Sequence, residues 1–380
     1  MLLGKLRKKY KTLNEVLISA SALRHNLQLY RDLLPGQAIC PVLKSNAYGH
    51  GLTLAAKIFD ELPSNSGEKQ TRPEFLIVDS LYEAYKLKEA KIQTPILILG
   101  YTLPENLKNK RHFPFHFAVS DLESAKILAA KKTALHLEID TGMSRSGFTL
   151  EELPEALTAL QKMGANISGI FTHFADADNP NSKAKTDKQC QLFQEAIHLT
   201  KEAGFQPKWM HASNSAGALK ARIPELNMAR VGISLYGLSP LQETDPQTEI
   251  LAKLKPVMEV TSTIIEKRKI KAGQSVSYNC TFTAEKDMEI GIIPFGYYEG
   301  IPRSLSSLPP FLGRICMNHA IIDLTDPSLQ ALDLNPGDKF TVYSSDPAAP
   351  NSFHNMAKLA GTITYELTTK ISESIRRRAV

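Results

Sequence analysis

The stretch ICPVLKSNAYGHG, residues 39–51, is the starting point for assigning the fold. It begins with an apolar run typical of a buried strand and continues through Lys44 into a turn that contains Gly49 and Gly51. Lys44 is therefore predicted to lie at the carboxyl end of a strand. In barrels built of alternating strands and helices, this end of each strand faces the active site.

Eight such runs occur in the first two-thirds of the chain, separated by segments with helical periodicity. Alternating strands and helices predict a parallel sheet. Eight units within about 240 residues fit a closed (β/α)₈ barrel better than an open sheet. The predicted strands span residues 38–43, 75–79, 96–100, 115–119, 134–140, 167–173, 209–212 and 228–231, and the clearest helical segments are 80–89, 122–130, 151–162 and 187–203.

The pattern changes near residue 256. Residues 257–265 are rich in β-branched side chains and predict a strand. The turn signals KAGQ, PFG and NPGDK follow, and helical patterns are rare until residues 352–360. We therefore predict an α/β fold with two domains. A (β/α)₈ TIM barrel covers residues 14–255, and a mostly-β domain covers residues 256–380, on which residues 1–13 could pack.

Composition excludes several classes of protein. The 380 residues are 43% hydrophobic and 22% charged, which is typical of a globular chain of about two domains. No apolar run is long enough for a membrane span, and the basic N-terminus lacks the apolar stretch of a signal peptide. The net charge of +6 comes mostly from the two ends of the chain, without a basic face bearing aromatic platforms, so we expect no nucleic-acid partner. Four widely spaced cysteines contain no CxxC pair, which favours a cytoplasmic protein without a zinc site or redox dithiol.

Lys44 is the first candidate catalytic residue. A lysine at a strand end that is partly removed from water becomes a nucleophilic amine, as covalent attachment to an aldehyde cofactor requires. Nearby, Tyr48 could direct its hydroxyl toward an anion. An isolated lysine would more often extend its ammonium to solvent. The complete string KSNAYGHG favours the cofactor interpretation.

The loops after the seventh and eighth strands predict a phosphate site. They contain HASNSAGAL, with Ser215, and ARVGISLYG, with Gly232 and Ile233. TIM barrels often bind phosphate with these two loops, through backbone N–H groups and a hydroxyl. Ser215 alone could equally be a helix N-cap.

Arg230 ends the eighth strand. A guanidinium facing a pyridine nitrogen could donate a hydrogen bond but could not supply a proton. The ring would then withdraw electrons more weakly, which favours quick reprotonation at Cα over decarboxylation or transamination. A structural salt bridge is the alternative.

Two more side chains follow barrel strands. His173, in FTHFADAD, could flank a cofactor ring. Together with Asp176 and Asp178 it could also suggest a metal, but no third nitrogen or sulfur ligand is spaced to join it, so we predict no metal. Arg145, in DTGMSRSGF, could clamp a substrate carboxylate or a phenolic oxygen.

In order, KSNAYGHG, DTGMSRSGF, THFADAD, HASNSA, RVGISLYG, VSYNCTF, GRICMN and TITYEL resemble the alanine racemase family of fold-type-III pyridoxal 5′-phosphate (PLP) enzymes. The resemblance extends from about residue 16 to residue 365. It implies PLP-dependent, two-base interconversion of L-alanine and D-alanine, which supplies D-alanine for peptidoglycan. It also implies a homodimer with shared active sites.

The resemblance assigns roles to individual residues. Lys44 would hold PLP and act as one acid/base, and Tyr278 of the partner subunit would be the other. Arg145 and the backbone of Met317 would hold the substrate carboxylate, and Tyr297 would line the entrance. His173 would also support Tyr278, and Arg230 would face the ring nitrogen. The implied cofactor-binding residues are Lys44, Tyr48, His173, Ser215, Arg230, Gly232, Ile233 and Tyr365. Spacing alone makes neither Tyr278 nor Met317 catalytic.

Two positions depart from the family pattern. Many members have a carboxylated lysine where this chain has Glu138. We hypothesise that the carboxylate of Glu138 supplies the negative charge to Arg145; the alternative is an exposed strand glutamate. The aspartate that commonly follows the methionine is here Asn318, which could alter substrate preference.

Two other functions are compatible with the residues. One is a broad-specificity amino acid racemase of the same fold, although those proteins are generally exported. The other is a non-catalytic PLP-carrier protein. The second domain of about 125 residues and Tyr278 argue against the carrier.

Overall fold

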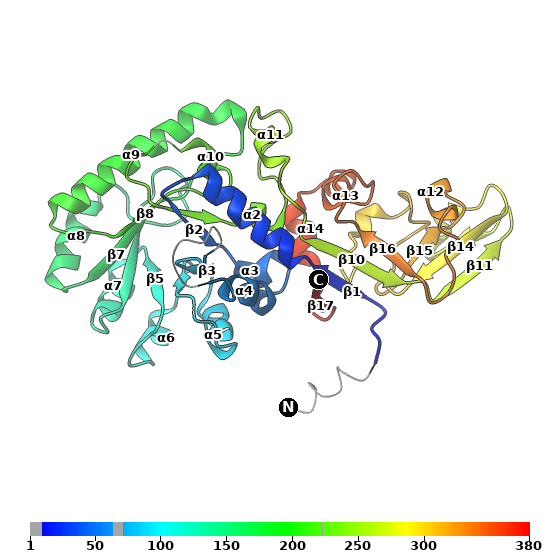
Figure 1. Ribbon diagram of the computed structural model, residues 1–380, viewed down its shortest axis with the longest axis horizontal. Helices are drawn as coiled ribbons and strands as arrows, with labels where there is room; N and C mark the ends of the chain where they lie inside the picture. The colour runs from blue at the N-terminus through cyan, green and yellow to red at the C-terminus, as the bar shows by residue number, and fades with distance from the viewer. Residues whose placement is uncertain (1–9, 64–70, 222) are drawn as a thin grey trace. The chain divides into compact units, whose positions relative to one another are not determined.

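The computed structural model describes residues 10–63, 71–221 and 223–380, which form two compact units (Figure 1). The barrel unit comprises residues 21–48 and 52–255. The second unit combines residues 10–20, 49–51 and 256–380. Within the described ranges, no helix has the length and apolarity needed to cross a membrane.

Eight parallel strands form the barrel unit. They are β2 (Ala38–Pro41), β3 (Leu76–Val78), β4 (Ile96–Ile98), β5 (His116–Val119), β6 (Ala134–Glu138), β7 (Asn166–Phe171), β8 (Trp209–His211) and β9 (Met228–Val231). Strands β3 to β8 pair side by side in chain order, and β2 pairs with β9. A bridge between Val42 and Ile77 joins β2 to β3. The Arg230 N–H donates to the Ser213 carbonyl oxygen at 3.0 Å, which joins β8 to β9 and closes the ring. The predicted (β/α)₈ barrel is confirmed.

Helices cover the outer face of these strands (Figure 1). In α8 (Leu153–Lys162), the buried residues Leu153, Ala156, Leu157 and Leu160 follow the spacing of one helix face. The four helical segments predicted most clearly from the sequence correspond to α5, α7, α8 and α9. The helices of this part of the chain are α2 (Ala20–Leu33), α4 (Leu52–Asp60), α5 (Leu81–Glu89), α6 (Pro104–Lys108), α7 (Leu122–Ala129), α8 (Leu153–Lys162), α9 (Lys183–Glu202), α10 (Gly217–Lys220) and α11 (Thr248–Leu251).

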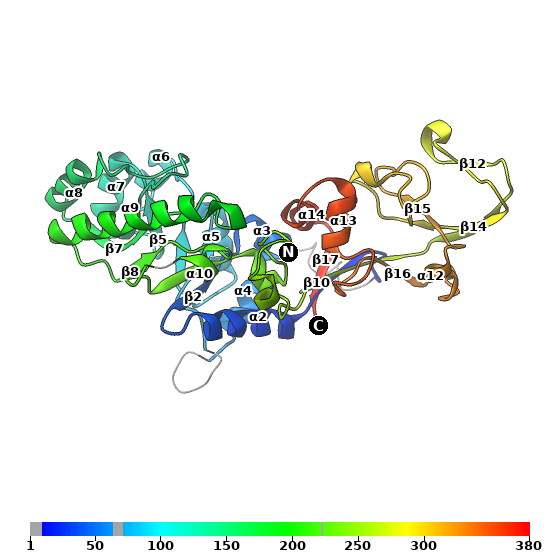
Figure 2. The ribbon, with the colours of Figure 1, turned by 90° about the horizontal axis from the view of Figure 1, so that it is seen from above.

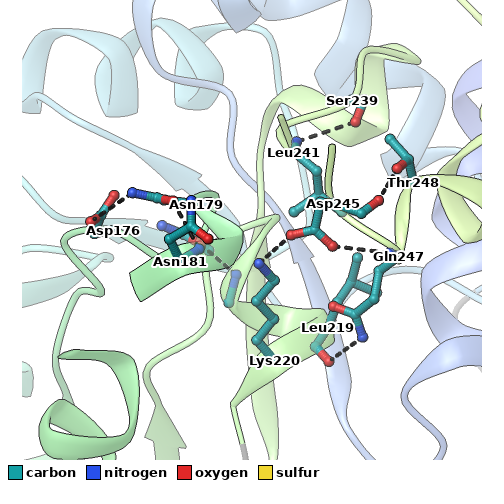
Figure 3. Close-up of polar contacts among 12 residues, drawn as sticks. Asp176, Asn179, Asn181, Leu219, Lys220, Ser239, Leu241, Asp245, Gln247 and Thr248 are labelled. Carbon is teal, nitrogen blue, oxygen red and sulfur yellow. Dashed lines mark hydrogen bonds and ion pairs between the residues drawn. The ribbon is translucent and has the colours of Figure 1, made fainter. Parts of the chain in front are cut away.

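A buried ion pair ties together the loops that follow β8 and β9. Lys220 of α10 pairs with Asp245, whose side chain is almost fully buried (Figure 3). The other carboxylate oxygen accepts the Gln247 N–H at 2.9 Å, and the Gln247 amide donates to the Leu219 carbonyl at 3.3 Å. The two loops predicted to bind phosphate are therefore held by one polar cluster.

Replacing Asp245 with alanine should lower the free energy of unfolding by about 3 kcal/mol, because it leaves the Lys220 ammonium largely buried without its partner. Urea unfolding followed by circular dichroism would measure the change. Asp187→Ala is the matched control, because the Lys183–Asp187 pair lies on the surface of α9 and should matter little. Equal effects of the two substitutions would contradict the assigned role of Asp245.

The second unit is mostly β-structure, as predicted. Its four-stranded sheet has the order β16-β10-β1-β17, a second sheet has the order β11-β14-β15, and β12 and β13 form a hairpin that projects from the other strands (Figure 2). The strands are β1 (Glu15–Ile18), β10 (Met258–Thr263), β11 (Glu266–Ile270), β12 (Ser275–Val276), β13 (Phe282–Thr283), β14 (Met288–Ile293), β15 (Ala320–Asp323), β16 (Lys339–Tyr343) and β17 (Arg376–Ala379); the helices are α12 (Pro327–Gln330), α13 (Phe353–Ala360) and α14 (Thr364–Lys370).

One of the basic residues near the C-terminus has a structural role in this unit. The Arg377 guanidinium donates to the carbonyl oxygens of Gly49, Ile371, Ser372 and Ile375 at 2.7–3.1 Å. The bond to Gly49 attaches the segment that follows Tyr48 to the second unit. The charged group of Arg377 therefore stabilises the backbone of this unit.

Candidate active site

A cavity of about 320 Å³ in the barrel unit brings together four of the predicted site residues. Lys44, Arg145, His173 and Arg230 all line it. They come from the carboxyl ends of strands β2, β6, β7 and β9, or from the loops that follow these strands. Active sites of such barrels lie at this end of the strands.

The backbone after Lys44 forms a left-handed turn. Four consecutive residues, Ser45 to Tyr48, have φ between 53° and 55°. This conformation costs a non-glycine residue about 1–2 kcal/mol, so the surrounding structure must stabilise the turn. The sequence had suggested that Gly49 and Gly51 provide the turn; the strain instead begins at Ser45, directly beside Lys44.

The buried carboxylate of Glu83 stabilises this turn. One of its oxygens accepts the Ser45 N–H at 2.7 Å, and the other accepts the N–H groups of Asp79 and Ser80 at 2.9 and 3.2 Å. Glu83 also completes the capping box of α5 with Ser80. A single side chain therefore connects the turn after Lys44 to the end of β3.

Glu83→Gln should destabilise the turn, because an amide in place of one carboxylate oxygen leaves a buried N–H without its acceptor, at a cost of about 1–3 kcal/mol. We expect a lower melting temperature, measured by circular dichroism. Glu89→Gln, at an exposed position of the same helix, is the control. If both variants behave like the wild type, Glu83 is only a helix cap.

Arg230 is held without a carboxylate partner. Its Nη1 donates to His211 Nδ1 at 2.7 Å and to the His211 carbonyl at 3.1 Å. Its Nη2 donates to the Thr172 carbonyl at 2.8 Å and to His173 Nδ1 at 3.2 Å. In the described part of the chain, no carboxylate lies within ion-pair distance, so the salt-bridge alternative is wrong. No acceptor there takes the Nε–H, which leaves one donor on a residue that lines the cavity.

Burial controls the charges around Arg230. It lowers the pKa of Arg230 to about 10, so the guanidinium remains a cation at neutral pH. Burial, together with the cations Arg230, Arg145 and Lys44, lowers the pKa of His173 to about 3. His173 is therefore neutral. Because its Nδ1 accepts from Arg230, its proton is on Nε2. No group of metal-binding side chains occurs among the described residues.

The predicted phosphate-binding residues also lie together. The Ser215 hydroxyl accepts the Gly232 N–H at 3.0 Å, and the 3₁₀ helix η2 (Ile233–Tyr236) begins at the next residue. The first N–H groups of such a helix have no partner inside it. A Cβ on Gly232 would lie 2.4 Å from the Tyr48 hydroxyl oxygen, so only glycine allows this approach. Tyr48, Ser215, Gly232 and Ile233 thus lie next to one another in the barrel unit.

In the second unit, the segments that contain Tyr278 and Met317 lie next to each other. The hydroxyl of Ser277 donates to the Arg314 carbonyl at 2.6 Å. Tyr278 begins the 3₁₀ helix η3 (Tyr278–Cys280), and its side chain is 66% exposed; that of Met317 is 55% exposed. Both side chains therefore remain accessible on this unit.

The predicted entrance residue Tyr297 belongs to the same region. Its N–H donates to the Cys316 carbonyl at 3.0 Å. A Cβ on Gly296 would lie 2.4 Å from the Met317 carbonyl oxygen, so the close packing of these backbones requires glycine. Tyr365 lies on α14 and is partly buried.

Models of the two domains of alanine racemase match the sequence. The N-terminal domain model covers residues 18–240, and the C-terminal domain model covers residues 257–379. The chain belongs to the alanine racemase family. It is 32% identical to the alanine racemase of Methanococcus maripaludis over 95% of this chain and 96% of that protein. It is 34% identical to that of Leptospira interrogans over 96% and 95% of the two chains.

Solved structures of family members have the same fold. The alanine racemase of Clostridium difficile superposes with a TM-score of 0.86 at 29% identity, covering 98% of this chain and 97% of that one. The enzyme of Bacillus anthracis, solved with bound L-Ala-P, has a TM-score of 0.82 at 27% identity, with coverage of 98% and 96%. The likeness includes both domains.

Both departures from the family pattern have structural partners. Glu138 is only 8% exposed, so the exposed-glutamate alternative is wrong. Its carboxylate accepts the Ser146 hydroxyl at 2.9 Å, whereas no ion pair joins it to Arg145 among the described residues. Asn318 donates its amide to the buried Glu299 at 2.9 Å. An aspartate at position 318 would instead place two carboxylates side by side.

The sequence alone did not reveal Glu83 or the histidines around Arg230. The string SLYE, residues 80–83, carries the signature of a capping box, which could have identified Glu83 as a structural residue. Its bond to Ser45 depends on two strand ends meeting in the barrel. The contacts of Arg230 likewise come from strands far apart in the sequence.

Proposed function

We propose that this chain is a PLP-dependent alanine racemase that interconverts L-alanine and D-alanine with Lys44 and Tyr278 as its two bases. The observation that carries the proposal is the pair formed by Lys44 and Arg230 at one cavity. Lys44 provides an amine for an aldehyde cofactor. Arg230 provides an unused Nε–H and no acid, which suits a ring nitrogen that stays unprotonated.

The residues present fit PLP. Ser215, the start of η2 and the Tyr48 hydroxyl offer donors for a phosphate monoester, and Tyr365 would add a further hydroxyl. When bound, PLP supplies an aldehyde that condenses with amines and a ring that delocalises negative charge from Cα. His173, neutral and hydrogen-bonded to Arg230, would hold the cofactor and support Tyr278.

Racemisation requires one acid/base on each face of Cα. Lys44 would remove or return the proton on one face, and Tyr278 would do so on the other. The substrate therefore does not have to rotate within the site. Arg145 and the Met317 N–H would hold the substrate carboxylate.

The proposed enzyme is a homodimer in which Tyr278 reaches the site of the partner subunit. The exposure of Tyr278 and Met317 on the second unit supports a role in contacts made outside their own unit. The proposed setting is the cytoplasm, where D-alanine would supply peptidoglycan synthesis. The four free cysteines suit a reducing compartment.

The test is purified protein with added PLP, assayed on alanine, serine, lysine and arginine. We expect a visible absorption band of the lysine-bound cofactor and the highest kcat/KM for alanine. Comparable values for lysine or arginine would favour the broad-specificity racemase. The absorption band without turnover of any of the four amino acids would favour the PLP carrier.

We expect Glu138→Gln to raise the KM for alanine by about tenfold, equivalent to ~1.4 kcal/mol, because it removes the negative charge beside Arg145. Burial raises the pKa of Glu138, and the Ser146 hydrogen bond opposes this shift. The folded protein therefore gains stability from the protonated Glu138 side chain. This gain is complete at pH values below the ordinary glutamate pKa and is lost as the pH rises through the raised pKa that Glu138 has in the folded protein.

Glutamine stays neutral at every pH. The melting temperature of Glu138→Gln relative to the wild type should therefore increase as pH rises from about 4 to 7. Glu151→Gln, at an exposed position, is the control. An unchanged KM would show that Glu138 does not act on Arg145.

A further inference from the structure

A row of histidines crosses the interior of the barrel and ends at Arg230. His116 of β5, His136 of β6 and His211 of β8 are joined by ring nitrogens. His116 Nδ1 lies 3.1 Å from His136 Nε2, and His136 Nδ1 lies 2.9 Å from His211 Nε2. His211 Nδ1 in turn lies 2.7 Å from Arg230 Nη1. His136 and His211 are completely buried, and His116 is partly buried.

The arginine fixes the proton positions along this row. A guanidinium can only donate, so His211 must accept at Nδ1 and carry its proton on Nε2. That N–H can donate only to a bare Nδ1 of His136, which places the His136 proton on Nε2. The same argument places the proton of His116 on Nε2. Burial lowers the pKa of all three imidazoles, that of His116 to about 4, so neutral rings are expected at pH 7.

The barrel is built to allow the contact between His136 and His211. Strand β7 lies between their strands, and at this level it carries Gly169. A Cβ on Gly169 would lie 2.3 Å from His136 Nδ1. Aromatic rings also fix the imidazoles: Phe75 contacts His116 and His136 edge-on, and Phe171 stacks on His211 at 4.9 Å.

We propose that His116, His136 and His211 form a one-way hydrogen-bonded chain that stabilises the Arg230 cation in place of a carboxylate and fixes its orientation. Each imidazole turns its unprotonated nitrogen toward Arg230, so the negative ends of three dipoles face the guanidinium. A carboxylate would cancel its charge more completely. Because neutral rings replace it, the cation keeps its field at the cavity; the Glu138 carboxylate, which lines the same cavity, acts on Arg230 only from beyond hydrogen-bond distance.

His116 and His136 are thus positioning residues for Arg230, although neither lines the cavity. This inference rests on the proposed role of Arg230 toward the ring nitrogen of PLP. The arrangement also predicts that a proton gained at any ring would interrupt the chain, since two N–H groups would then face each other.

The direct test is nitrogen NMR of the PLP-loaded enzyme labelled with ¹⁵N-histidine. The three rings should be neutral and protonated on Nε2, with their signals assigned from single His→Gln variants. A proton on Nδ1 of His211 or His136, or on both nitrogens of either ring, would overturn the proposal. The proton positions are read from the wild-type protein, the variants serve only to assign the signals, and the result does not depend on turnover.

Variants test the effect on the site. His136→Gln retains an acceptor and a donor, whereas His136→Phe removes both. We expect His136→Phe to lower kcat about 10- to 100-fold with KM within about twofold, and to shift the absorption band of the bound cofactor. His136→Gln should have a kcat and a cofactor absorption band close to those of the wild type. Gly169→Ala should resemble the phenylalanine variant.

Equal kcat values and spectra for His136→Phe and His136→Gln would overturn the proposal. If His136→Phe does not fold, His116→Phe at the partly exposed end provides the same comparison with His116→Gln. Wild-type enzyme that binds PLP but does not racemise alanine would instead contradict the proposed function, whatever the positions of the histidine protons.

Discussion

Replacing Lys44 with alanine should abolish racemisation, with a fall in kcat of at least about 10⁴-fold, because we propose this residue as both the covalent anchor and one of the two bases. The visible absorption band of the lysine-bound cofactor should disappear at the same time. Lys44 follows β2 and is the only lysine among the described residues that line the cavity, so no other amine there can replace it.

The control for Lys44 is Lys57→Ala, which removes an exposed lysine from α4 and should change neither turnover nor absorbance. Lys44→Arg tests whether a positive charge at this position is enough or whether a nucleophilic amine is required. Arginine keeps the cation but stays protonated, so this variant should also be inactive. A Lys44→Ala protein that keeps both the band and the turnover would exclude Lys44 as the anchor.

Tyr278→Phe should lower kcat by about 10²–10⁴-fold while leaving the absorption band intact, because it removes the proposed base on one face but not the proposed cofactor anchor. Stopped assays of D-alanine formation and absorbance spectra of the same sample would separate the two effects. Tyr82→Phe, which removes another exposed tyrosine hydroxyl, should be silent.

The same variant tests whether active sites are shared. If Tyr278 serves the partner subunit, a mixed dimer of Lys44→Ala and Tyr278→Phe chains contains one doubly altered site and one intact site. Mixing the two inactive proteins under exchange conditions should then restore activity. Continued inactivity, with exchange shown by a size tag, would mean that each chain supplies both bases to its own site.

The barrel could be predicted from the sequence because each strand is a short apolar run next to a segment with helical periodicity. The same holds for the placement of Lys44, since the run before it is uniformly apolar and the turn after it contains glycines. The second domain was recognisable from its turn signals. These features depend on neighbouring residues, which local patterns describe well.

The features that position the site depend on distant residues instead. Nothing in the string SNAY indicates four left-handed residues, because their stabilisation comes from Glu83, 38 positions away. His116, His136 and His211 lie on separate strands, and Gly169 gives no sign that an imidazole occupies the space of its missing side chain. Such contacts arise only when the barrel closes.

The account is tested most directly by incubating the wild-type protein and PLP with L-alanine in D₂O. We predict equal final amounts of L- and D-alanine, with deuterium at Cα of the product, since the two proposed bases would exchange protons with solvent on opposite faces. No D-alanine in a sample that shows the absorption band of the bound cofactor would contradict the assignment of this chain as an alanine racemase.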